Sequence, residues 1–370
     1  MRRLLTCMLK ETTSGPTLRS QIIFRSWYHS SADLMSFVVK SVPMITSVMI
    51  AEELIMHQGW QSSESDAYFE AQRHQADHCD DKTAWMFYDM MKEIAKDMHH
   101  TTGGLHIEHL PHDDARILDC CMAPGGFLSV CLEINPGHRA VAFTLPVDEG
   151  GHRVLLPLDD GRVKTNFLDI TMLSGDVGVT KIPFNHPDAV NFLPQQLPPE
   201  KTFDIVLCDG QVLRTHQRAS YRERREARRL TLSQIILGLE HIDPGGTMII
   251  LLHKLETFNT ANLLHKFSKF ASLKVYKSVK YHAKRSSFYL IATNIQPYHV
   301  EALSVVSAWK KLWITATLGT DMEYERQLRE EELGVYSLLN EYGPELMRLG
   351  QEIWCTQANA LARMTWVHRR

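Results

Sequence analysis

Between residues 115 and 295, short apolar runs alternate with stretches in which apolar residues recur at helical spacing. The apolar runs predict seven strands, at Arg116–Cys121, Arg139–Thr144, Val163–Leu168, Phe203–Cys208, Thr247–Leu252, Leu273–Val279 and Phe288–Thr293. The stretches between them predict helices at Phe127–Ile134, Leu230–Ile242 and Ala261–Phe270. This alternation is typical of a mostly parallel sheet with crossover helices on both faces. The pattern therefore predicts an α/β fold with one doubly wound, seven-stranded sheet.

Helical patterns flank this alternation on both sides, and an irregular segment interrupts it. A leading helix is predicted over Asp81–Met98, and Gly103-Gly104 ends it. The segment Thr171–Lys201 carries five prolines and predicts an irregular surface loop. Amphipathic stretches follow Pro297, at Val300–Leu318, Met322–Tyr342 and Pro344–Arg363, with breaks at Gly319 and Gly343. We therefore expect a core domain at 81–296 and a helical appendage at 297–370, which packs on the sheet or binds a partner protein.

The first 80 residues form an extension with a different composition. Before Glu52 they hold six lysine and arginine side chains against two acids, Glu11 and Asp33, together with several serines and threonines. This composition is typical of a mitochondrial presequence. A loosely packed tail is equally compatible with it. We expect residues 1–80 to be partly disordered or helical.

The overall composition excludes several classes of protein. Hydrophobic residues make up 44% and charged residues 22%, as in ordinary globular proteins, and no apolar run approaches the ~20 residues that cross a bilayer. The net charge of −3 means that any nucleic-acid site must be a local basic patch. Seven scattered cysteines without a CxxC pair indicate reduced thiols inside the cell, in cytoplasm or nucleus, with the mitochondrion as the alternative. The group His74, His78 and Cys79 has no second ligand pair, so we predict no metal site.

The strongest local motif runs from Ile117 to Phe127 and joins an apolar strand to a helix through Ala123-Pro124-Gly125-Gly126. Glycines let the backbone approach a ligand closely, and the N-terminus of the following helix offers free N–H groups to a carboxylate. The GxGxxG fingerprint of dinucleotide sites is absent from this turn. The motif therefore predicts a nucleotide-like ligand other than NAD, although a tight turn without a ligand has the same appearance.

This motif resembles the cofactor loop of the FtsJ/RrmJ family of RNA ribose methyltransferases, in which an acid precedes Ala-Pro-Gly-Gly and an aromatic residue. Three later segments, Phe167–Ile170, Phe203–Gly210 and Leu251–Lys254, resemble further motifs of that family in the same order. The resemblance implies a Rossmann-like, class I methyltransferase fold that uses S-adenosyl-L-methionine. By the same resemblance, the cofactor site is expected at Asp119, Pro124, Gly125, Gly126, Phe127, Asp169 and Asp209.

The resemblance also places the catalytic aspartate at Asp209 and a catalytic lysine at Lys254. Both follow predicted strands, and ligands of open α/β sheets bind beyond the carboxyl ends of the strands. A ribose hydroxyl is a very weak acid, so its methylation benefits from an amine held neutral to accept the proton. We expect Lys254 to be that base and Asp209 to orient it. The alternatives are a surface lysine at a strand end and a turn aspartate before Gly210.

The chain departs from the family pattern of Lys-Asp-Lys-Glu at two positions. Ser287 stands where the glutamate is expected, and the leading helix has no lysine in register, although Lys92 or Lys82 is a possible substitute. An acid is also expected at the end of the second strand, where this chain has Thr144. The sequence therefore leaves two of the four residues of the family pattern, the first lysine and the glutamate, without a clear match.

A basic patch follows the strand that ends at Asp209. Residues 214–229 hold seven arginines against Glu223 and Glu226. On a helix, Arg218, Arg222, Arg225 and Arg229 lie on one stripe beside the expected active site, a pattern that suits an RNA backbone. We expect RNA contacts at Arg214, Arg218, Arg222 and Arg225. The alternative is a solvated helix face with internal Arg222–Glu226 pairs.

These patterns lead to one preferred function and two alternatives. We predict an S-adenosylmethionine-dependent transferase that needs no metal and methylates a ribose 2′-hydroxyl of ribosomal, transfer or capped RNA. Ser287 and the missing first lysine favour the second hypothesis, a catalytically silent protein of the same fold that binds RNA or a protein. A base methyltransferase is the third, because such enzymes need no lysine base.

Overall fold

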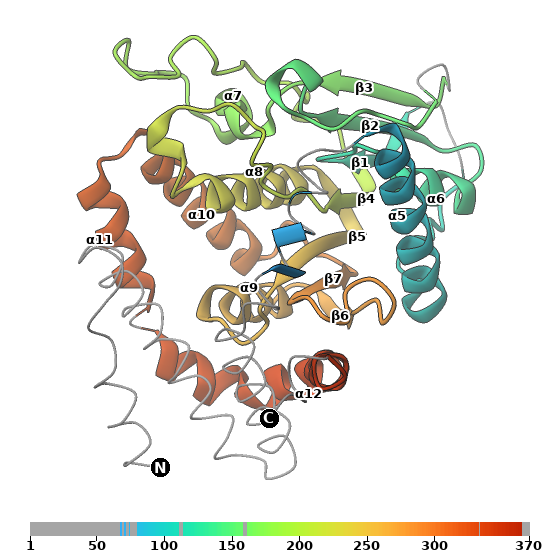
Figure 1. Ribbon diagram of the computed structural model, residues 1–370. Helices are drawn as coiled ribbons and strands as arrows, with labels where there is room; N and C mark the ends of the chain where they lie inside the picture. Colours follow the sequence, from blue (N-terminus) through green and yellow to red (C-terminus); the bar gives the residue numbers. More distant parts are fainter. Residues whose placement is uncertain are drawn as a thin grey trace.

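A seven-stranded sheet forms the centre of the computed structural model (Figure 1). The structure describes residues 67–68, 70–71, 74, 80–110, 114–157, 161–332 and 334–364. The strands are β1 (Ala115–Asp119), β2 (Arg139–Thr144), β3 (Val163–Phe167), β4 (Phe203–Cys208), β5 (Ile242–His253), β6 (Ser272–Tyr276) and β7 (Ser287–Thr293). Their order is β3-β2-β1-β4-β5-β7-β6, with β7 antiparallel to both neighbours and the other pairs parallel. This is the α/β fold with one seven-stranded sheet that the pattern predicted.

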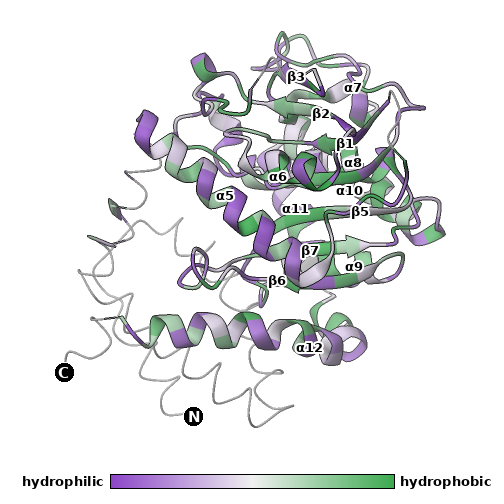
Figure 2. Ribbon diagram, turned by 90° about the vertical axis from the view of Figure 1, so that its right-hand side faces the viewer, coloured by the Kyte–Doolittle hydropathy of each residue, from purple (hydrophilic) through white to green (hydrophobic). Residues whose placement is uncertain are grey.

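Helices cover both faces of this sheet. Helices α5 (Asp81–Thr102) and α6 (Gly126–Ile134) lie on one face, and their apolar side chains form one buried cluster with Ile117 and Ile205. On the other face, α8 (Glu226–His241), α9 (Phe258–Ser268) and α10 (Val300–Leu318) form a second cluster. In Figure 2 the central strands are mostly hydrophobic, whereas α5 and α12 (Val335–Leu361) alternate between hydrophilic and hydrophobic residues. A strand buried on both faces must be apolar throughout, which is why its sequence shows an unbroken apolar run.

The ends of α5 follow from local chemistry. Asp80 caps its first turn, because the carboxylate accepts a hydrogen bond from the Thr83 amide at 2.8 Å. Gly103 ends the helix in the left-handed region, at φ 73°. The glycine pair was correctly predicted as the end of this helix.

The C-terminal helices share the core of the sheet domain. Trp309 and Trp313 of α10 belong to the same buried cluster as α8 and β4. The Trp313 indole donates a hydrogen bond to Ser233 of α8 at 3.0 Å. Helix α12 packs against α9 and β6, below the sheet in Figure 2. Helices α10 and α12 therefore pack on the sheet domain, as one of the two alternatives predicted.

The predicted break at Gly343 is wrong, because α12 runs from Val335 to Leu361 with Pro344 inside it. Leu339 and Leu346, on either side of the proline, are buried in the main core. Their packing outweighs the hydrogen bond that proline cannot make. The predicted helix at 322–342 is instead divided between α11 (Asp321–Glu332) and the start of α12.

The remaining segments add little regular structure. Between β3 and β4 the chain holds a 3-10 turn, η2 (Ile170–Met172), one turn of helix, α7 (Ser174–Val177), and otherwise irregular backbone. Within the described part of the chain, no helix is long and apolar enough to cross a membrane. The predictions for residues 1–80 fall almost entirely outside the described residues.

Candidate active site

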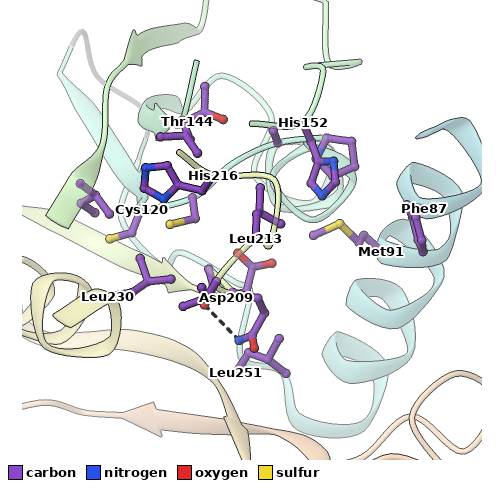
Figure 3. Close-up of a pocket in the computed structure, with 18 of the residues that line it drawn as sticks. Phe87, Met91, Cys120, Thr144, His152, Asp209, Leu213, His216, Leu230 and Leu251 are labelled. Atoms are coloured by element: carbon purple, nitrogen blue, oxygen red, sulfur yellow. Dashed lines mark hydrogen bonds between the residues drawn. The ribbon is translucent and has the colours of Figure 1, made fainter. Parts of the chain in front are cut away.

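A cavity of about 290 Å³ lies at the carboxyl ends of β1, β2 and β4, beside α5 (Figure 3). In parallel α/β sheets this edge collects the loops and is the usual place for a ligand. Its lining comes from α5, from the ends of the strands and from the residues that follow them, and includes Phe87, Met91, Cys121, Pro124, Thr144, His152, Asp169, Asp209, His216, Leu251 and Tyr289. The cavity is mostly apolar with a few acids and histidines, which suits an organic ligand with polar ends.

The glycine turn between β1 and α6 shapes one wall of the cavity. Gly125 has φ 103°, a conformation that side-chain-bearing residues rarely adopt, and a Cβ there would lie 2.9 Å from the Leu156 Cβ. A Cβ on Gly126 would lie 2.1 Å from the Tyr88 carbonyl oxygen, so α5 depends on this glycine to approach the turn. The two glycines therefore fix the backbone that Pro124 presents to the cavity.

Asp119 and Phe127 support this turn from behind and do not line the cavity. Asp119 is buried, and its carboxylate accepts a hydrogen bond from the Cys121 amide at 3.0 Å. Phe127 lies in the core, with its ring centroid 5.6 Å from that of Tyr289. Both side chains are buried in the packed interior, so in this structure they support the turn and do not face the cavity.

Asp209 reaches the cavity from the end of β4, as expected. Burial raises its pKa to about 7. Burial and the nearby Asp209 charge also raise the pKa of Asp119. Asp209 is thus poised to ionise near neutral pH, and a positively charged ligand beside it would favour the ionised form.

Leu251, and not Lys254, stands beside Asp209. In the parallel pairing of β4 with β5, Cys208 is opposite Ile250, so Asp209 and Leu251 are the next residues along the two strands. Both line the cavity in Figure 3. Lys254 does not line it, and the structure therefore does not bring the two predicted catalytic residues together there. Lys254 follows the end of β5 at His253, three residues beyond Leu251.

Lys254 has a different environment. It adopts φ 49° as the chain leaves β5, and its amide donates to the Ser286 carbonyl at 3.1 Å. Burial lowers its pKa, an effect that the negative charge of Glu256 opposes. Glu256 also interacts with Lys277 and with Trp354 of α12. Glu256 therefore links the electrostatic surroundings of Lys254 to Trp354 of α12.

Neither substitute for the first lysine lines the cavity. Lys92 forms an ion pair with Glu133 of α6 at 2.8 Å, and hydrogen bonding to this glutamate raises the pKa of Lys92. Lys82 is exposed near the start of α5. The cavity side of α5 carries Phe87, Met90 and Met91 instead.

The predicted arginine stripe is wrong, because three of its four arginines are buried. Helix α8 begins only at Glu226, and the exposed fractions of Arg222, Arg225 and Arg229 are 3%, 3% and 0%. An RNA phosphate cannot reach guanidinium groups that are covered in this way. Arg222 does pair with Glu226, as the alternative expected, but inside the protein and not on a solvated face.

These arginines form a buried network around Glu226. Arg222 donates to Asp169 at 2.6 Å and to the Thr171 hydroxyl at 2.9 Å. Arg229 donates to Glu226 at 2.8 Å and to the Thr171 carbonyl at 3.0 Å. Burial alone would raise the pKa of Asp169, but hydrogen bonding to His216 and the Arg222 charge hold it well below its usual range. The network thus fixes Asp169, an expected cofactor contact, at the cavity wall.

Arg225 and Arg218 also make internal contacts. Arg225 donates to the carbonyls of Ala316 and Gly319 at 3.3 and 2.8 Å and so satisfies the C-terminal end of α10. Arg218 donates to the Leu213 carbonyl at 2.9 Å, and its side chain is only 9% exposed. Of the arginines predicted to bind RNA, Arg214 alone has an exposed position in the structure.

Three side chains at this wall have the composition of a metal site. Ligand atoms of Asp169, His216 and Glu226 lie within 4.8 Å of one another. Arg222 donates to both carboxylates, so its guanidinium already supplies the positive charge between them. His216 lines the cavity, and its Nε2 atom lies 3.4 Å from Oδ2 of Asp169. The arrangement therefore serves as an ion-pair network that holds Asp169 and His216 in place.

Sequence reasoning missed a group at the end of β5. His253 Nδ1 lies 3.1 Å from the Ser287 hydroxyl, and its Nε2 lies 2.6 Å from the Gln211 side-chain oxygen. The signal was available, because side chains two apart on a strand share a face, and His253 is two residues beyond Leu251. The resembling motif instead predicted the neighbouring residue, Lys254, as the catalytic group.

Several solved structures are similar to this chain at low identity. An O-methyltransferase family protein from Burkholderia thailandensis shares 13% identity, with a TM-score of 0.33, over 59% of this chain and 61% of that one. An rRNA methylase from Streptococcus thermophilus shares 12% identity, with a TM-score of 0.30, over 57% of this chain and 95% of that one. TrmN from Thermus thermophilus shares 12% identity, with a TM-score of 0.32, over 55% of this chain and 49% of that one. The chain thus spans less than two thirds of the Burkholderia protein.

Comparison with curated proteins finds no match for this sequence. The model of the FtsJ-like methyltransferase family matches residues 98–295, which is more than half of the chain and includes the whole sheet and all of the cavity lining except the wall formed by α5. The order of its motifs, the strand order and the ligand-sized cavity at the carboxyl ends of the strands agree with this match. The chain belongs to the FtsJ-like methyltransferase family.

Proposed function

We propose that this protein transfers the methyl group of S-adenosylmethionine to a ribose 2′-hydroxyl of RNA. The observation that carries the proposal is the cavity beside Asp209, which lies at the carboxyl ends of the strands of the matched family region, the edge where class I folds bind ligands. The cavity offers an apolar body with an ionisable acid, as a ligand with an adenine ring and a sulfonium centre requires.

The residues present fit this methyl donor. The Pro124–Gly126 turn leads into the N-terminus of α6, whose free N–H groups suit a carboxylate. Asp169 and His216 are held by the buried network and provide polar contacts at another wall. Ionised Asp209 would stabilise a positive sulfonium, and the bound donor supplies an activated methyl group. The remaining requirement is a group that accepts the hydroxyl proton.

Product analysis tests the proposal directly. Purified protein is incubated with labelled S-adenosylmethionine and total RNA, and the RNA is then digested to nucleosides. We expect label in 2′-O-methyl nucleosides. Label in base-methylated nucleosides would replace the ribose assignment with a base methyltransferase, and Asp209→Ala is the control that separates this activity from a contaminant.

The pKa of Asp209 predicts a pH-dependent affinity for the methyl donor. At pH below about 7 the carboxyl is increasingly protonated and loses its attraction for the sulfonium, so affinity falls by up to about tenfold per pH unit. Calorimetry between pH 5.5 and 8.5 measures this slope. S-adenosylhomocysteine, which has no sulfonium charge, should show a shallower slope, and Asp209→Asn should remove the difference between the two ligands. Equal slopes for both ligands in the unmodified protein would contradict the assigned role of Asp209.

A second candidate function has one specific observation in its favour. Leu251 occupies the position beside Asp209, and Ser287 replaces the expected glutamate, so neither expected charge is present there. A protein that binds the methyl donor and RNA without transferring the methyl group would tolerate these changes. In that case the donor binds, but no RNA class becomes labelled.

A further inference from the structure

A groove of about 340 Å³ opens beside the cofactor cavity, between α8, α9 and α10. It shares Gly210, Gln211 and Leu251 with the cavity, so the two spaces meet at the ends of β4 and β5. Arg228, Asn259 and Lys266 contribute polar and positive groups to its lining. A groove of this size and polarity suits one nucleotide of an anionic chain. An acceptor hydroxyl that enters through the groove therefore approaches the cavity beside Gln211 and Leu251.

His253 lies at this junction. It lines the groove and follows Leu251 by two residues on β5, so both side chains leave the strand on the same face. The residue reaches the surface, and its ring has two partners, the Ser287 hydroxyl at 3.1 Å from Nδ1 and the Gln211 side-chain oxygen at 2.6 Å from Nε2. Ser287 is the residue opposite His253 in the antiparallel pairing with β7, and it is buried. The Nδ1 side of the ring is thus fixed by the fold, whereas Gln211 belongs to an exposed loop.

The electrostatic surroundings keep this ring neutral. Desolvation lowers the pKa of His253, and the positive charges of Lys277, Lys254 and Arg285 lower it further. A neutral imidazole carries one nitrogen with a lone pair that can accept a proton. The Gln211 oxygen can only accept, so beside it Nε2 carries the proton and Nδ1 accepts from the Ser287 hydroxyl. Once a substrate hydroxyl takes the place of Gln211, Ser287 can instead accept from Nδ1–H, and the ring then offers the lone pair of Nε2 to the substrate.

We propose that His253 is the catalytic proton acceptor of the methyl transfer, with Ser287 and Gln211 as positioning residues. The inference rests on the proposed function and replaces the lysine that the family pattern suggests. The ribose O–H bond breaks and its proton goes to Nε2. The oxygen forms a bond to the methyl carbon, and the electrons of the broken S–C bond stay with sulfur, which becomes a neutral thioether. The imidazolium then releases its proton to water, so no further reactant is needed.

Single-turnover methyl transfer, measured from pH 5 to 9 on an RNA that the unmodified protein labels, tests the proposal. We expect His253→Ala to lower the rate by about 10²–10⁴-fold, the usual contribution of a general base, and to leave affinity for S-adenosylmethionine within about threefold. His253→Gln keeps a hydrogen bond to Ser287 but cannot accept a proton, and we expect it to be equally slow. His106→Ala is the matched control, because His106 is an exposed histidine that lines neither the cavity nor the groove.

Two further variants separate the alternatives. Ser287→Ala should lower the rate by about tenfold and shift the midpoint of its pH profile, which a merely structural residue would not move. Lys254→Ala should lose at least tenfold less activity than His253→Ala. The reverse order, or an unchanged rate in His253→Ala, overturns the proposal while the proposed function stands. If the unmodified protein binds the donor but labels no RNA, the proposed function itself fails, and the inference fails with it.

Discussion

Replacing Glu226 with glutamine should lower the free energy of unfolding by about 3 kcal/mol. Glu226 is 2% exposed and accepts hydrogen bonds from two arginines, of which Arg229 is fully buried. Glutamine keeps the shape but removes the charge that compensates these guanidinium groups. Loss of one partner from a buried ion network typically costs ~3–5 kcal/mol, because the remaining charge stays out of water. Urea unfolding followed by circular dichroism measures the change.

Glu223→Gln is the matched control for this measurement. Glu223 is exposed, and Arg218, its partner, also donates to the Leu213 carbonyl, so replacement of Glu223 should change the stability by less than about 1 kcal/mol. Acid provides a second test of the same network. Because the pKa of Asp169 is lowered in the folded state, its stabilising contribution is present above the unfolded pKa, ~3.9, and is lost as the pH falls below that value. Equal stabilities of the Glu226 and Glu223 variants would show that the network contributes little.

Gly125→Val should abolish measurable binding of S-adenosylmethionine, with affinity reduced by at least about 10²-fold. At φ 103° a branched residue is strained by roughly 1–2 kcal/mol, and its Cβ would contact Leu156 at 2.9 Å. The turn must move to relieve the backbone strain and the close contact with Leu156, and the backbone that faces the cavity moves with it. A displaced turn no longer matches a ligand that must approach it within hydrogen-bonding distance. Calorimetry on folded protein, verified by circular dichroism, measures the effect.

Gly161→Ala supplies the comparison for this variant. A Cβ at Gly161 would meet nothing within 4 Å, and its backbone lies outside the left-handed region. We expect unchanged donor affinity. Binding by Gly125→Val as tight as that of the Gly161 variant would remove the turn from the cofactor site.

The fold was predictable because the central strands are buried on both faces. Segments such as Phe203–Cys208 are apolar at nearly every position, so their bounds in the sequence agree with those in the structure. The arginines show where such reasoning ends. Spacing places Arg222 and Arg229 along one side of a helix, but it cannot tell whether that side faces water or a buried acid such as Glu226. The answer depends on Asp169 and Thr171, some 50 residues earlier in the chain.

Register limited the prediction of the site in the same way. A motif locates a lysine near the end of a strand, but the contact with Asp209 depends on how far β5 continues before the chain turns. A change of one residue moves a side chain to the other face. Leu251 and His253 therefore face the cavity and groove, while Lys254 adopts a separate backbone conformation after the strand.

Because α10 packs on the sheet domain, the part of the chain that folds together extends beyond the part that matches the family model. The region that defines the family ends at residue 295, yet Trp313 is fully buried beyond that point and Arg225 of the preceding region satisfies the carbonyls at the end of α10. A protein truncated after residue 296 would leave the α8 surface without its cover and Arg225 without these acceptors. Inheritance of this domain in evolution therefore requires that its C-terminal helices be inherited with it, or that another segment cover the same surface.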